Sequence, residues 1–201
     1  MKQEQHLVLH GLAIKKYATP EAIAGIIAMS PAKVASILSD SEGRGRVTLI
    51  QGKYSLTPTG RMALTSDYSR FYSEFRRNPE VLRAYEDFET ANSALKALIT
   101  RWQVVEVLGS AVANDHNDKN YDAKVIDALG ALHERADRIL ARLAQQLPRM
   151  QVYREKLQFA LERAEDGKVE WVSDAKIESF HTLWFELHED LLCMLDRRRE
   201  E

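Results

Sequence analysis

Three helix-start signals in the first part of the chain constrain the fold more than any other feature. Each is a hydroxyl residue followed by proline, at Thr19-Pro20, Ser30-Pro31 and Thr57-Pro58. The hydroxyl oxygen can accept a bond from a backbone N–H group that lacks a partner at a helix start, and proline is tolerated at the first helical position. Because the first two signals are so close together, they predict two short helices that meet across a very tight turn.

The spacing of apolar residues agrees with these helix-start signals. A first helix is predicted to end at Tyr17-Ala18, and the next two carry the buried stripes Ile23, Ile26, Ile27 and Val34, Ile37, Leu38. After Gly43 and Gly45 the pattern becomes that of β-strands, over 46–50 and 54–57, around Gln51-Gly52-Lys53. The predicted order is therefore helix, helix, helix, strand, strand, helix.

That order is the order of a winged helix-turn-helix. The run Lys53-Tyr54-Ser55-Leu56-Thr57-Pro58-Thr59-Gly60-Arg61 resembles the second wing strand and exit of MarR-like transcriptional regulators. MarR proteins place a dimerisation helix ahead of the winged helix and usually carry an Asp-x-Arg wing, whereas the wing region here is Glu42-Gly43-Arg44-Gly45-Arg46. The layout, with the reader first and a helical domain last, is more similar to PadR-type regulators. The resemblance implies a DNA-reading winged helix over residues 1–66 and no particular subfamily.

In such a fold the second helix of the turn lies in the major groove, with the face opposite its core stripe toward the base edges. On the predicted third helix this face carries Ala32, Ser36 and Ser39, flanked by Lys33. Asp40 would repel phosphates, so backbone attraction is expected from Lys33, Arg44, Arg46 and Lys53. The alternative for each of these residues is an ordinary solvated surface.

Charge is distributed unevenly along the chain. The whole sequence has a formal net charge of −2, while residues 1–66 hold eight basic and four acidic side chains and so carry +4. The remainder must be acidic. This division suggests two parts with different partners, the first of them a polyanion such as double-stranded DNA.

Residues 67–201 are predicted to be a bundle of amphipathic helices that serves for dimerisation and effector binding. Proline at position 79 predicts a helix boundary, and apolar spacing predicts a helix from there to about Leu108. A polar loop is expected over 114–120, and two helices end near Pro148 and Gly167. An extended segment over 168–172 is expected before a last helix from Ser173 to about Arg199. The aromatic stripe Tyr68, Phe71, Tyr72, Phe75 fits either a homodimer interface or a join between domains.

The last predicted helix places two histidines, His181 and His188, on one apolar face with Trp184. Imidazoles beside an indole are suited to an effector such as an aromatic acid or an acyl-CoA compound, and Trp102 is expected to complete this pocket. Asp115, His116 and Asp118 join it only if their loop folds over it. Equally, each histidine can be a core residue with its hydrogen bonds satisfied.

Catalytic patterns are weak. Glu178 and His181 match half of a di-iron carboxylate motif whose second half is missing, and the chain has no phosphate-binding glycine loop, nucleophile elbow or metalloprotease motif. The single cysteine, Cys193, lies in an apolar run and is expected to be a reduced, buried residue. No enzyme activity, cofactor or metal site is therefore expected.

These observations together predict a mainly α-helical protein with a small β-hairpin wing. No run of eighteen apolar residues and no signal peptide is found, so a cytoplasmic location without membrane contact is expected. The expected function is a homodimeric transcriptional regulator that binds an operator and responds to a small molecule. The alternatives are a non-catalytic adaptor whose winged helix binds protein, and a metal-dependent helical sensor or enzyme.

Overall fold

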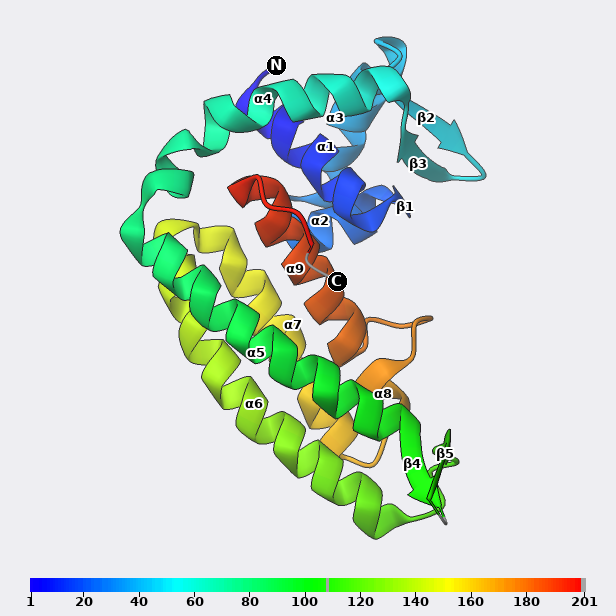
Figure 1. Ribbon diagram of the computed structural model, residues 1–201. Coiled ribbons are helices and arrows are strands. Elements are labelled where there is room, and N and C mark those ends of the chain that lie inside the picture. Colours follow the sequence, from blue (N-terminus) through cyan, green and yellow to red (C-terminus); the bar gives the residue numbers. More distant parts are fainter. Residues whose placement is uncertain (108, 200–201) are drawn as a thin grey trace. The chain divides into compact units, whose positions relative to one another are not determined.

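The computed structural model describes residues 1–107 and 109–199, which are mostly helical with a small antiparallel sheet (Figure 1). The chain forms two compact units. Unit 1 comprises Met1–Asn78 and Glu186–Glu201, and unit 2 comprises Pro79–Phe185. The boundary predicted at residue 66 falls inside a helix, because the fourth helix continues to Arg77. The C-terminal segment of unit 1 was expected to belong to the helical domain.

Unit 1 contains the predicted order of elements with one addition. Its elements are α1 (Gln3–Lys15), β1 (Tyr17–Ala18), α2 (Pro20–Ile27), α3 (Pro31–Gly43), β2 (Val47–Ile50), β3 (Lys53–Leu56) and α4 (Pro58–Arg77). The addition is β1, which was expected only to end the first helix. It pairs antiparallel with β3, which also pairs with β2, giving the strand order β1-β3-β2. The β2–β3 hairpin projects from the helices of this unit (Figure 1).

Two of the predicted caps close as expected. The Thr19 hydroxyl accepts a bond from the Ala22 N–H, and the Thr57 hydroxyl accepts one from the Gly60 N–H at 3.0 Å. Ser30 makes no such side-chain bond, although α3 still begins at Pro31. Gly60 is required by its surroundings, because a Cβ atom there would lie 1.8 Å from the Arg46 carbonyl oxygen. The turn from β3 into α4 therefore packs backbone against backbone.

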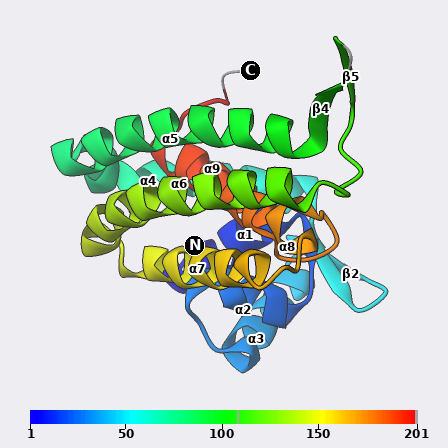
Figure 2. The same cartoon turned by 90° about the horizontal axis from the view of Figure 1, so that it is seen from below.

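Unit 2 consists of long helices that lie side by side, as Figure 2 shows for α5, α6 and α7. Its elements are α5 (Pro79–Gln103), β4 (Val104–Val107), β5 (Ser110–Ala113), α6 (Lys119–Gln146), a 3-10 turn (Pro148–Met150), α7 (Gln151–Glu165), α8 (Glu170–Ser173) and the first residues of α9 (Phe180–Leu195). The division between the units falls within α9, after Phe185. The predicted apolar stripes are buried, including Leu95, Ile99, Leu129, Leu140, Leu157 and Leu161.

Three predictions for unit 2 are wrong: the end of α5, the extended segment over 168–172 and the bounds of the last helix. The helix from Pro79 ends at Gln103, so Val105 lies in β4, and Leu108 lies outside the described residues. A run of β-branched residues followed by Gly109 with a φ of 79° favours a hairpin over further helix. The segment expected to be extended over 168–172 contains the helical turn α8. Ser173 ends that turn, and α9 covers only Phe180–Leu195.

Among residues 1–107 and 109–199, no single helix is both long and apolar enough to cross a bilayer. Taken together, α2 and α3 reach that limit by length and composition, but the pair is bent by 115°.

Candidate functional site

The outer face of α3 is the first candidate site, and unit 1 alone forms it. Val34 and Leu38 are fully buried, whereas Ala32, Lys33, Ser36 and Ser39 are exposed. The predicted burial of Val34 and Leu38 and the exposure of the opposite face are therefore confirmed, whereas Ile37, expected in the same buried stripe, is only half-buried. Small side chains and hydroxyls occupy the outer face, so another molecule can approach the helix closely there.

The four predicted cations surround this face and the hairpin, and each already contacts a neighbour. Lys33 forms an ion pair with Glu4 of α1, and Arg44 forms one with Asp40 at 3.0 Å. Both pairs are well exposed, and such pairs contribute only about 0–1 kcal/mol, so a phosphate can compete for either cation. The Lys53 ammonium lies 5.4 Å from the centre of the Tyr17 ring. These contacts position the cations, and because each contact is weak, an incoming anion can displace it with little loss of free energy.

Arg46 differs from the other three cations because it is only half-exposed. Its guanidinium donates to the Gln5 side-chain oxygen at 3.0 Å. A groove of about 600 Å³ runs between the start of α1 and α3, and Arg46 lines it together with Met1, Lys2, Glu4, Gln5, Ser36, Ile37, Asp40 and Arg44. The groove thus brings Ser36 together with two of the predicted phosphate-binding arginines.

The tip of the β2–β3 hairpin carries apolar side chains that the sequence reasoning did not mark as surface residues. Leu49 is 45% exposed and Ile50 is 50% exposed, and the Tyr17 hydroxyl donates to the Ile50 carbonyl oxygen at 2.5 Å. Apolar groups at such a tip are suited to contact with another molecule. Val47 and Leu49 lie on the same side of β2, yet only Val47 is buried, because Leu49 lies nearer the free end of the hairpin.

A buried polar cluster in unit 1 was also missed. The His10 ring nitrogens lie 2.7 Å from the Tyr68 hydroxyl and 2.8 Å from an Asp190 carboxylate oxygen, and all three side chains are buried. Burial raises the pKa of Tyr68 far above its usual value. Since α1, α4 and α9 each supply one member, this cluster joins the chain end to the start of the chain within unit 1. No sequence spacing could reveal a contact of this separation.

The aromatic stripe of α4 packs inside unit 1. The rings of Tyr68 and Tyr72 contact the rings of His6 and His10 from α1, with Tyr68 and His6 centroids 4.9 Å apart. Both tyrosines are buried. For these two residues the structure therefore supports a role in the unit's own core.

The predicted effector residues are divided between the units, since Trp102, His181 and Trp184 belong to unit 2 and His188 to unit 1. Trp184 is buried and stacks on Phe88 with ring centroids 4.9 Å apart. Its indole N–H donates to the Asn92 side-chain oxygen at 3.0 Å, which uses the only donor a tryptophan side chain has. Trp184 is thus committed to the core of unit 2.

His181 is half-buried, and burial lowers the pKa of its imidazole. The ring is therefore mostly neutral near pH 7, so one nitrogen can donate a hydrogen bond and the other can accept one. Trp102 makes a different contact, with the ring of His116 at 4.4 Å. Of the unit 2 members of the predicted pocket, His181 keeps the most freedom to meet a ligand.

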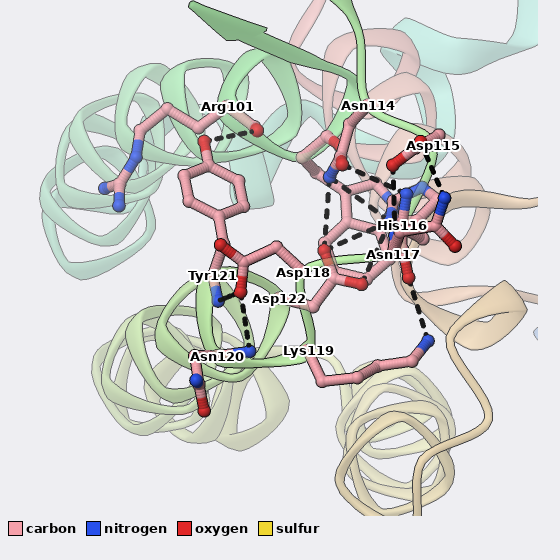
Figure 3. A network of polar contacts seen from close by, with 11 residues as sticks. Arg101, Asn114, Asp115, His116, Asn117, Asp118, Lys119, Asn120, Tyr121 and Asp122 are labelled. Atoms are coloured by element: carbon pink, nitrogen blue, oxygen red, sulfur yellow. Dashed lines mark hydrogen bonds and ion pairs between the residues drawn. The ribbon is translucent and has the colours of Figure 1, made fainter.

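The loop over 114–120 does more than face solvent (Figure 3). The Asn114 amide donates to the Trp102 carbonyl oxygen at 3.0 Å and to the Asp122 carboxylate at 3.1 Å, and His116 lies 3.1 Å from the same carboxylate. Asp118 accepts two backbone bonds at the start of α6. Asn114 and His116 therefore fasten the end of α5 to the start of α6. Asp115 is exposed and bonds only locally, to Asn117.

The acidic and thiol side chains considered for catalysis, Glu178 and Cys193, are in an ion pair and a partly buried position, respectively. Glu178 pairs with Lys156 at 2.7 Å, and burial raises the pKa of the Cys193 thiol to about 11, which keeps it protonated at neutral pH. Across residues 1–107 and 109–199, no group of three or more His, Cys, Asp or Glu side chains is arranged to hold a metal ion. Comparison of the chain with protein-family models, with curated proteins and with solved structures gives no match.

Proposed function

We propose that unit 1 is a winged helix-turn-helix that binds duplex DNA, and that the protein is a homodimeric transcriptional regulator. The observation that carries this proposal is the outer face of α3, which is exposed, rich in small and hydroxyl side chains, and bordered by cations that neighbours hold only weakly. The element order and the projecting β2–β3 hairpin support it.

In this proposal α3 enters the major groove. Ser36 and Ser39 reach base edges with their hydroxyl groups, and Ala32 contacts a thymine methyl group. Lys33, Arg44, Arg46 and Lys53 contact phosphates, which fix the register of the helix on the duplex without reading sequence. The ion pair between Asp40 and Arg44 reduces the repulsion that a free Asp40 carboxylate would exert on the backbone.

The helical unit is the place we propose for a small effector, such as an aromatic acid or an acyl-CoA compound. His181 is the residue we assign to that site, because its imidazole is neutral near pH 7 and only half-buried. An effector changes DNA affinity only if it binds two arrangements of the readers with different affinity.

A second candidate function is an adaptor that binds protein through the hairpin. The exposed Leu49 and Ile50 favour this candidate, since apolar side chains at the end of a hairpin gain from burial against a partner. The two candidates differ in salt dependence. DNA binding weakens steeply with added salt, whereas apolar protein contact does not.

The test is a mobility-shift titration over salt concentration, using the DNA upstream of the protein's own coding sequence and an unrelated duplex. Replacing Lys53 and Arg46 by Ala should weaken binding to both duplexes and reduce the salt slope by about 0.9 for each phosphate that the variant no longer neutralises. Lys124→Ala and Lys168→Ala, at exposed positions of unit 2, are the matched controls and should leave the slope unchanged.

Ser36→Ala supplies the sequence-specific arm of this experiment. It should cost about 1–3 kcal/mol on the upstream DNA and little on the unrelated duplex if the hydroxyl reads a base edge. Equal affinity and an equal salt slope for the native protein and the Lys53, Arg46 double variant would remove these two residues from the interface, and no binding of the native protein to either duplex would remove DNA from the proposal.

A further inference from the structure

The β4–β5 hairpin of unit 2 is a two-stranded sheet with an exposed outer strand. Its strands pair with each other, and no third strand joins them in the part of the chain that the structure describes. Figures 1 and 2 both show it projecting beyond the ends of α5 and α6. All four residues of β5 are exposed, and Val112 is 41% exposed. A two-stranded hairpin is at best marginally stable alone, so this one gains from a further strand.

The two edges of the hairpin differ in charge. Exposed edges are normally protected by lysine, proline or other charged residues that discourage further pairing. β5 reads Ser110-Ala111-Val112-Ala113 and has no such residue, whereas β4 carries Glu106. The edge open to pairing is therefore that of β5.

Hydrogen bonding within the hairpin fixes which backbone groups face outward. Val112 is opposite Val105, and the Asn114 N–H donates to the Gln103 carbonyl oxygen at 2.8 Å. In an antiparallel pair, residues that bond inward alternate with residues that bond outward. Asn114 and Val112 thus bond toward β4, and the N–H and C=O groups of Ala111 and Ala113 point away from it.

We propose that this edge pairs antiparallel with β5 of a second copy of the chain, about a two-fold axis through Val112. Ala111 then exchanges hydrogen bonds with Ala113 of the partner subunit, and the symmetry repeats the exchange. Val112 lies opposite Val112 of the partner subunit as a non-hydrogen-bonded pair, with about 4.5 Å between Cα atoms. The result is a four-stranded sheet with β4 of each copy on the outside.

A second copy fits this edge because the sequence is complementary to itself. Pairing about Val112 places only uncharged residues, Ser110 to Ala113, in the inner strands and keeps both Glu106 side chains in the outer ones. Pairing two β4 edges instead would place both Glu106 carboxylates on one face of neighbouring strands, where like charges destabilise a sheet. A four-residue edge is much smaller than a standard interface, so we expect a dimer of about micromolar affinity.

The role that we give to this dimer rests on the proposed function, because it links two DNA-binding units. Two readers linked by this sheet bind two half-sites, and the link raises the effective concentration of the second reader once the first has bound. The dimer itself can be measured without DNA. Its failure is therefore distinguishable from failure of DNA binding.

The first experiment uses sedimentation velocity on the full chain from about 1 to about 200 µM, a range that spans micromolar affinity. The native protein should shift from monomer to dimer, and Val112→Lys should remain monomeric because two ammonium groups would lie directly opposite. An equimolar mixture of the Val112→Lys and Val112→Glu variants should dimerise again. A native protein that stays monomeric, or a lysine variant that dimerises normally, would overturn the proposal.

A disulfide experiment tests the register. Val112→Cys should form a covalent dimer under mild oxidation, because the two thiols are directly opposite across the axis. Ala111→Cys is the matched control and should not, since residue 111 lies opposite residue 113 of the partner subunit and on the other face of the sheet. The native protein, whose single thiol is Cys193, is the blank. Equal crosslinking at 111 and 112 would exclude this register.

Affinities for a single half-site and for a full site distinguish the β5–β5 dimer from the proposed DNA binding. Val112→Lys should bind a single half-site like the native protein and lose at least tenfold in affinity for the full site. A native dimer that binds no DNA would retain the inference and remove the proposed function. A native protein that stays monomeric and binds a full site no more tightly than the lysine variant would retain the proposed function and remove the inference of a β5–β5 dimer.

Discussion

The two units close their cores by different means. Unit 1 brings residues from both parts of the sequence together, through the buried contact of His10 with Asp190 and the half-buried ion pair of Lys15 with Glu186 at 2.7 Å. Unit 2 is one continuous segment whose successive helices bury apolar stripes, with neutral contacts such as Trp184 to Asn92 inside. Apolar side chains fill both interiors, including Leu187, Leu191 and Met194 of the C-terminal segment. In unit 1 this segment also contributes to an ionisable pair, His10 with Asp190, in which both side chains are fully buried.

This difference has an energetic basis. An apolar stripe is attracted to any other apolar surface, so it selects a partner only through shape. A buried histidine beside a carboxylate is stabilised only when both groups meet, because an uncompensated buried charge costs several kcal/mol. We infer that the His10–Asp190 contact specifies where residues 186–195 dock in unit 1.

The largest effect is expected from breaking that contact. Asp190→Ala should lower the free energy of unfolding by about 3 kcal/mol, the upper end for a buried polar group that loses its hydrogen-bond partner, because it takes the carboxylate away from the fully buried His10 ring. Urea denaturation measures this change, and hydrogen exchange should show residues 186–195 opening first.

Asp87 in unit 2 offers the control. It forms an exposed ion pair with Arg142, and Asp87→Ala should cost no more than about 1 kcal/mol. If the two substitutions destabilise the protein equally, the buried pair does not distinguish unit 1 from unit 2.

A smaller effect is expected in unit 2. Asn92→Ala removes the acceptor of the buried Trp184 indole N–H, and the unsatisfied donor should cost about 1–3 kcal/mol. Tryptophan fluorescence during denaturation follows the change. Asn120→Ala, an exposed amide in the same unit, should stay within about 0.5 kcal/mol of the native protein. An effect at Asn92 as large as that at Asp190 would mean that unit 2 also depends on polar closure.

Sequence reasoning predicted unit 1 well wherever the signals are local. Thr19 and Thr57, with the prolines that follow them, correctly predicted the starts of α2 and α4, because a cap bonds within a few residues of itself. The exposed positions of α3 followed from the buried stripe. The entry of residues 186–201 into this unit was missed, because it depends on a contact between positions 10 and 190.

In unit 2 the apolar stripes, the helix start at Pro79 and the helix ends near Pro148 and Gly167 were predicted correctly. The end of α5 was not, since the hairpin after Gln103 is held by the Asn114 side chain, which donates to the Trp102 carbonyl oxygen. The start of α9 had a local signal that was overlooked. Ser179, rather than Ser173, accepts a bond from the Thr182 N–H at 3.3 Å. The predicted effector residues belong to different units because the face of a single helix does not reveal that the division between the units falls within α9.

The smallest effect concerns His181, which sharpens the contrast between the two interiors. His10 has a carboxylate partner, whereas burial alone lowers the pKa of His181 from its usual 6.5. The unfolded chain therefore takes up the proton first as pH falls, so the native protein loses stability from about pH 6.5 downward, through the lower pKa of the folded state. His181→Gln removes this dependence, and the stability difference between native and variant proteins should shift in favour of the variant between pH 8 and pH 5. Thermal unfolding at both pH values measures the shift, which partial exposure of the ring keeps small. A difference that does not change with pH would show that this imidazole is solvated, and that its neutrality near pH 7 does not come from burial.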